Sequence, residues 1–128
     1  MVSSSILVVD DEESLANMFR QFLVNQGFDA IYFTDPLLAC EHYRCNPNKY
    51  SLIITDLRMP GMSGIDLSNN IRQLSDTVKI VLITAFDLSD LKDRPAYKHA
   101  RIDLVIQKPV KFSRLRKIVD NVLKVQNN

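Results

Sequence analysis

The sequence has few of the features that are typical of a protein stabilised by disulfides or a structural metal, or of one that spans a membrane. Its 128 residues include only two cysteines, Cys40 and Cys45, and their spacing fits neither a CxxC redox motif nor a zinc pair. We expect free thiols in a reducing cytoplasm. No apolar run approaches the roughly 18 residues of a membrane span, and the first residues lack the features of a signal peptide. We therefore expect a soluble, cytoplasmic protein.

An excess of charge of one sign is also missing. Sixteen Lys and Arg against fifteen Asp and Glu leave a net charge of +1, which argues against a sequence-wide nucleic-acid surface. A local basic cluster lies near the end of the chain: Lys111, Arg114, Arg116, Lys117 and Lys124. We interpret it as a solvated helix face that makes no direct contact with nucleic acid or membrane. The length and composition fit one domain, residues 1–128, with an ordered core over about 5–125.

Short apolar runs rich in β-branched residues alternate with longer stretches of helical period. The runs are residues 6–9, 30–33, 52–55, 80–84 and 104–106. This alternation predicts an α/β fold with a single doubly wound, five-stranded parallel sheet. The first, third and fourth runs are continuously apolar, as expected of central strands buried on both faces. The second run is mixed, so we expect it nearer an edge.

Apolar residues at helical spacing predict the helices between these runs. The clearest stripe consists of Leu15, Met18, Phe19, Phe22 and Leu23. We expect this stripe to lie in the core and its helix to stop at Gly27. A second helix is predicted from Pro36, a third after Gly64 and a last one over 112–122. Pro95 falls where the interior of a fourth helix would lie, which predicts a short or irregular helix there.

Polar residues stand where four of the five predicted strands end, and ligands of such sheets bind at the carboxyl ends of the strands. They are Asp10 and Asp11 after the first strand, Asp56 after the third, Thr84 at the end of the fourth, and Lys108 after the fifth. Three converging carboxylates repel one another unless a cation shares them, and an all-oxygen set suits Mg²⁺. Lys108 and Thr84 suit the oxygens of a phosphoryl group, which a carboxylate can accept as a nucleophile. Taken singly, Asp10 and Asp11 also fit a helix N-terminus.

Four sequence blocks resemble the signature blocks of response-regulator receiver domains from two-component signalling. The blocks are residues 7–12 (LVVDDE), 56–64 (DLRMPGMSG), 84–85 (TA) and 108–109 (KP). The resemblance spans residues 5 to 125 and implies the flavodoxin-like receiver fold with strand order 2-1-3-4-5. It implies a phosphorylation-dependent switch in which Asp56 receives a phosphoryl group from the phosphohistidine of a sensor histidine kinase or phosphotransfer protein. A homodimer or a downstream effector is a further implied partner.

The resemblance also implies individual roles. The implied Mg²⁺ ligands are the carboxylates of Asp11 and Asp56, that of Asp10 through a water, and the backbone carbonyl of Arg58. Lys108 pairs with the phosphoryl oxygens, and Thr84 moves to hydrogen-bond them. Pro109 matches a position that often follows a cis peptide bond. Such a domain is not an enzyme acting on other substrates, because it catalyses only its own phosphotransfer and dephosphorylation.

The sequence departs from the family pattern at Val105, where receivers usually carry an aromatic residue. A β-branched side chain has no ring to bury, so the usual coupling of that ring to Thr84 cannot operate as such. We also hypothesise that Arg58 and Phe86 limit the access of water to the acyl phosphate. One alternative is a pseudo-receiver that signals without phosphorylation. Another is a Mg²⁺-dependent aspartyl phosphatase, which Glu12 disfavours because such enzymes resemble a D-x-D pattern after the first strand.

Overall fold

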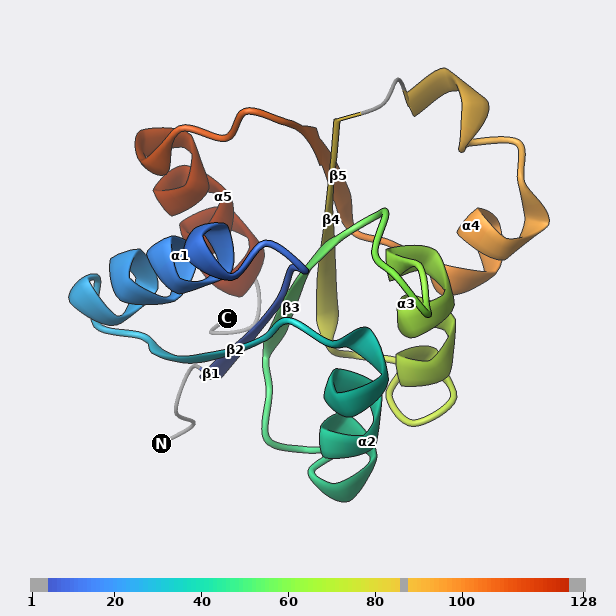
Figure 1. Cartoon of the computed structure of the whole chain (residues 1–128), viewed down its shortest axis with the longest axis horizontal. Coiled ribbons are helices and arrows are strands. Elements are labelled where there is room, and N and C mark those ends of the chain that lie inside the picture. The colour runs from blue at the N-terminus through green and yellow to red at the C-terminus, as the bar shows by residue number, and fades with distance from the viewer. Residues whose placement is uncertain (1–4, 86–87, 125–128) are drawn as a thin grey trace.

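The structure, a computed structural model, describes residues 5–85 and 88–124 as alternating strands and helices (Figure 1). The strands are β1 (Ser5–Val9), β2 (Asp29–Phe33), β3 (Leu52–Asp56), β4 (Lys79–Thr84) and β5 (Leu104–Gln107). The helices are α1 (Glu13–Asn25), α2 (Pro36–Cys45), α3 (Gly64–Arg72), α4 (Pro95–Ala100) and α5 (Phe112–Lys124), with a 3₁₀ turn η1 (Leu88–Asp90) before α4. In the described part of the chain, no helix is long and apolar enough to cross a membrane.

The strands form one parallel sheet in the order β2-β1-β3-β4-β5, which confirms the predicted topology. β1 and β3 are buried along their whole length, as their continuous apolar runs predicted. β2 lies at one edge with most of its residues partly exposed, which confirms its predicted place. β5 forms the other edge.

The two faces of the sheet are covered by different helix pairs, because successive strand residues point to opposite sides. Ile6 and Val8 belong to the core that includes the buried residues of α1 and α5. Leu7 and Val9 belong to the core that includes those of α2 and α3. Figure 1 shows α1 and α5 on one side of the sheet and α2 and α3 on the other. This sandwich leaves the carboxyl ends of the strands open for a site.

One residue of the α1 stripe does not lie in the core. Phe19 and Leu23 are buried as predicted, but Met18 is 49% exposed, so its predicted core position was wrong. Successive helix residues are turned by about 100°, which leaves Met18 well off the direction shared by the buried side chains. The helix ends close to the predicted stop, and Gly27 follows it with a φ of 96°, a conformation that suits glycine.

The fourth helix is short, as predicted, but the reason given for it was wrong. Pro95 is the first residue of α4 and does not interrupt its interior. A proline fits this position because the first amide of a helix has no intrahelical partner. α4 stands beside α3, where the Asn69 side-chain amide donates to the Ala96 carbonyl at 3.0 Å. This short helix is thus attached sideways to its neighbour.

Arg72, at the end of α3, fixes the other end of α4. Its guanidinium donates to the backbone carbonyls of Ala100 (2.9 Å), Arg101 (2.9 Å) and Val78 (2.6 Å), and it pairs with Asp103 at 3.3 Å. The residue is 9% exposed. A planar guanidinium suits this role, because its five donors can serve several acceptors at once. Sequence reasoning missed this residue, because its acceptors are backbone groups.

Candidate metal and phosphoryl site

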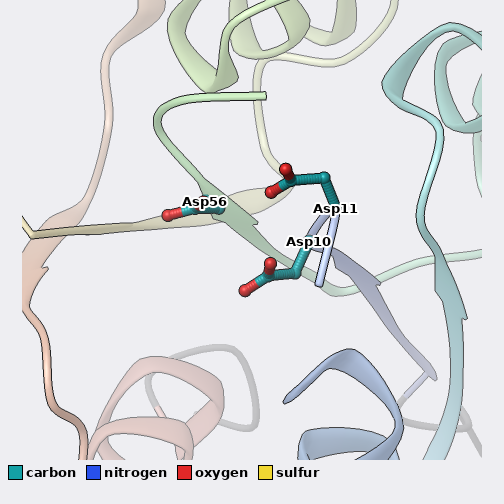
Figure 2. A group of neighbouring side chains, drawn as sticks. All are labelled: Asp10, Asp11 and Asp56. Carbon is teal, nitrogen blue, oxygen red and sulfur yellow. The ribbon is translucent and has the colours of Figure 1, made fainter. Parts of the chain in front are cut away.

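The structure brings Asp10, Asp11 and Asp56 together at one edge of the sheet (Figure 2). Asp56 ends β3, and Asp10 and Asp11 follow β1 directly. The register pairs Val9 with Thr55, so the next residues of the two strands are neighbours. One carboxylate oxygen from each of the three residues lies within 4.8 Å of the others. The geometry is that of a small all-oxygen cluster.

Lys108 joins this cluster from the end of β5. Its ammonium lies 3.3 Å from Asp56 Oδ1 and 3.6 Å from Asp10 Oδ2. The backbone amide of Lys108 donates to the Thr84 carbonyl at 2.7 Å, which ties the residue to the end of β4. The Lys108–Pro109 peptide bond is cis, as the resemblance implied. Four of the five strands therefore contribute to one site.

Burial sets the electrostatics of the site. Asp10 is 2% exposed and Asp56 is 9% exposed. Burial raises the pKa of both carboxyls, although the Lys108 ammonium opposes the shift for Asp56 and the Glu12 amide does so for Asp10. Burial also lowers the pKa of Lys108, but the two carboxylates outweigh it, and that pKa is raised overall. One ammonium thus pairs with two of the three carboxylates of the cluster, and the donor set fits a divalent cation.

The remaining residues predicted for the site are Thr84, Arg58 and Phe86. Thr84 is the last residue of β4 and is 1% exposed. The register pairs its predecessor, Ile83, with Asp56, so Thr84 lies on the strand beside the cluster. The Arg58 side chain is exposed, two residues after Asp56. The roles of the Thr84 hydroxyl and the Arg58 carbonyl stay predictions, and Phe86 lies outside the described residues.

Gly64 supports the cluster from behind, a role that sequence reasoning did not assign. A Cβ atom on Gly64 would overlap the backbone oxygen of Asp56 and lie 2.8 Å from Leu82 Cδ1. Its own amide donates to the Leu57 carbonyl at 2.7 Å. α3 therefore begins in direct contact with the backbone of the central carboxylate, which only a residue without a side chain permits. Nothing in the sequence signalled this contact, because it depends on the distance between α3 and the Asp56 backbone.

We expect Gly64→Ala to lower the free energy of unfolding by about 1–3 kcal/mol, the usual cost of overpacking. The better helix propensity of alanine offsets at most about 1 kcal/mol of this. Urea denaturation measures the change. Ser14→Ala, an exposed helix position, serves as control and should stay within about 0.5 kcal/mol of the parent. Equal stability of the parent and the Gly64 variant would contradict the close packing.

The sequence is similar to a known protein family and to curated proteins. The family model described as the response regulator receiver domain matches residues 6–120. The regulatory protein VanRB of Enterococcus faecalis is 33% identical over 123 residues, which cover 96% of this chain and 54% of VanRB. The sensory transduction protein RegX3 of Mycobacterium tuberculosis is 38% identical over 85 residues, 66% of this chain and 36% of RegX3. The chain thus spans about half of the first relative and a third of the second.

Solved structures give the same result for the fold. The response regulator TrrA of Thermotoga maritima, solved in complex with Mg²⁺ and BeF, is 28% identical with a TM-score of 0.80, covering 94% of this chain and 99% of that one. A response regulator receiver domain protein from Clostridium thermocellum has a TM-score of 0.86 at 22% identity, with 97% of each chain covered. At 22% identity, the likeness to the Clostridium thermocellum protein shows a shared fold alone.

Proposed function

This chain belongs to the response-regulator receiver family, and from that premise we propose that Asp56 accepts a phosphoryl group from the phosphohistidine of a histidine kinase or phosphotransfer protein. The observation that carries the proposal is the convergence of Asp10, Asp11 and Asp56 with Lys108 at one sheet edge. A carboxylate nucleophile, neighbouring carboxylates able to share a metal and a cation for the phosphoryl oxygens are the parts that such a transfer needs.

Mg²⁺ is the metal that this donor set fits best. Asp11 and Asp56 would hold it directly, Asp10 through a water, and the Arg58 carbonyl would complete the protein ligands. When bound, Mg²⁺ neutralises charge on the phosphoryl oxygens. The excess of three carboxylates over the single ammonium supports the proposal, because a bound cation would relieve the repulsion among the carboxylates.

The residues of the chain perform the remaining steps. A carboxylate oxygen of Asp56 forms a bond to phosphorus while the phosphorus–nitrogen bond of the donor breaks in line, and the electron pair leaves with the imidazole. Lys108, already 3.3 Å from Asp56, keeps its ammonium on the phosphoryl oxygens. The Thr84 hydroxyl donates a hydrogen bond to one of them. The acyl phosphate formed is the signal, and other molecules are not turned over.

Incubation of the protein with acetyl phosphate and Mg²⁺, followed by intact-mass measurement, tests this function. We expect one phosphoryl adduct per chain with Mg²⁺ and none when EDTA is present, because the carboxylates alone repel the incoming dianion. An unmodified protein would contradict the proposal and favour a pseudo-receiver. Steady turnover of a generic phosphate ester would instead favour the phosphatase alternative.

A further inference from the structure

Residues 89–99, which run from η1 into α4, are attached to the body of the protein through one fully buried side chain. Among the side chains of residues 89–99, Leu91 alone is fully buried, at 4% exposed. Its neighbours Asp90 and Lys92 are exposed, and Tyr97 is partly buried. A segment with so few buried apolar contacts opens more easily than the core does. Leu91 is therefore the main attachment of this segment.

Leu91 packs in a cluster whose residues adjoin the candidate site in the chain. Its cluster contains Leu57, Ile65 and Leu82. Leu57 directly follows Asp56, and Leu82 lies in β4 two residues before Thr84. Val105, which stands where receivers usually carry an aromatic residue, lies partly buried against the same cluster. Leu91 thus belongs to the cluster against which Val105 packs, and it connects the segment to the two strands that carry Asp56 and Thr84.

The other end of the segment is held differently. Arg72 donates to the carbonyls of Ala100 and Arg101, where α4 ends. Breaking these bonds would leave buried polar groups unsatisfied, which costs more than separating apolar side chains from one another. If the segment moves, α4 therefore stays fixed at its C-terminal end and the part around Leu91 leaves first.

A cleft borders the buried Leu91. The cleft has a volume of about 330 Å³ and lies between the start of α3 and the segment before α4. Leu57, Ile65 and Leu91 line its apolar part, and Arg58 and Arg94 line its polar part. Leu91 consequently lies between its apolar cluster and this cleft.

We propose that Leu91 is a positioning residue that transmits the phosphorylation state of Asp56, in place of the aromatic side chain that Val105 lacks. In the unphosphorylated protein, Leu91 holds the segment against Leu57 and Leu82. When the Thr84 hydroxyl turns to the phosphoryl oxygens, the packing of Leu82 in the same strand changes and Leu91 leaves the cluster. This readout rests on the function proposed above, but the resting contact can be tested without it.

Hydrogen exchange of residues 89–99, measured by mass spectrometry, tests the proposal on wild type, Leu91→Ala and Leu91→Met. Leu38→Ala, at a leucine of α2 that is 59% exposed, is the matched control. Without ligands we expect exchange in Leu91→Ala to be about tenfold faster than in wild type, because the buried contact is lost. Leu91→Met, which keeps the volume, and Leu38→Ala should stay within about twofold of wild type.

Adding beryllofluoride and Mg²⁺ tests the readout. We expect exchange of the same residues to rise about tenfold in wild type and not to rise further in Leu91→Ala. The yield of phosphoryl adduct from acetyl phosphate should be the same within about twofold in all variants, because Leu91 does not touch the reacting atoms.

Unchanged resting exchange in Leu91→Ala, an equal response of wild type and Leu91→Ala to beryllofluoride, or loss of the adduct in Leu91→Ala would each overturn the proposal. Absence of the adduct in wild type would instead overturn the proposed function, while the resting exchange would still decide on the Leu91 contact. If Leu91→Ala does not fold, Leu91→Val replaces it. An exchange rate between those of wild type and a free segment is then expected, and a wild-type rate overturns the proposal.

Discussion

Asp56→Asn is expected to leave the protein folded and to abolish the phosphoryl adduct formed with acetyl phosphate and Mg²⁺. Asparagine has nearly the shape of aspartate, but its neutral amide oxygen is a poor nucleophile and a weaker metal ligand. The site would also lose one of the carboxylates that gather within 4.8 Å of one another. Intact-mass measurement with and without Mg²⁺ gives the result directly.

The same substitution has an expected effect on stability in the absence of metal. Burial raises the pKa of Asp56 above its ordinary value of 3.8, so the folded state binds more protons than the unfolded state above that pH. Stability is therefore lost as the pH rises from 3.8 through the folded pKa. The neutral amide of the Asp56→Asn variant does not titrate, so this variant should be the more stable protein at neutral pH without Mg²⁺. Urea denaturation at several pH values measures this.

Asp66→Asn is the matched control for both measurements, since Asp66 is exposed in the first turn of α3. It should form the adduct as the wild type does, and its stability should follow the wild-type pH profile. An adduct that persists in Asp56→Asn would place the phosphoryl group on another residue and contradict the role of Asp56. A steeper pH dependence in Asp56→Asn would contradict the electrostatic account.

Arg72→Met is expected to lower the free energy of unfolding by about 3–5 kcal/mol, the usual cost of breaking a buried charged network. The carbonyls of Ala100, Arg101 and Val78 would lose the guanidinium donor, and Asp103 would lose one of its partners. Methionine fills similar volume, so the change isolates the polar interactions from a cavity. Urea denaturation measures the loss, and exchange of the α4 amides should rise together with it.

Arg44→Met is the control for this prediction. Arg44 pairs with Glu41 on the surface of α2, with both side chains more than half exposed. An exposed pair of this kind contributes at most about 1 kcal/mol. Equal losses in the two arginine variants would show that the Arg72 network is no more important than a surface pair, which would contradict its structural role.

Most of the fold could be predicted because periodicity and strand-end chemistry are local signals. The buried strands and the edge position of β2 agree with the prediction from these signals, and the strand order agrees with what the family resemblance implied. Met18 and Pro95 show where local signals fail. Met18 has the right spacing for the stripe, but its burial depends on how α1 is rotated against the sheet. Whether Pro95 interrupts a helix or begins one depends on where α4 starts, and α4 starts at Pro95 itself.

In the candidate site, too, some residues could be predicted from the sequence and others could not. The sequence named Asp10, Asp11, Asp56 and Lys108, because parallel strands bring their carboxyl ends to one edge. It did not reveal the support from Gly64, because the contact depends on the distance between α3 and the Asp56 backbone. The matched family model spans these positions, yet the role of each residue rests on the experiments proposed above.

The sequence by itself determined the α/β class and the identity of the residues at the strand ends, since each follows from neighbouring residues and one repeated pattern, whereas the strand order was implied by the family resemblance. Only the tertiary structure decided that Arg72 holds the end of α4 and that Leu91 attaches the segment before it. These contacts join residues far apart in the chain, and their partners are backbone carbonyls and ordinary leucines. No residue type or spacing announces such contacts, because they depend on how finished elements pack together.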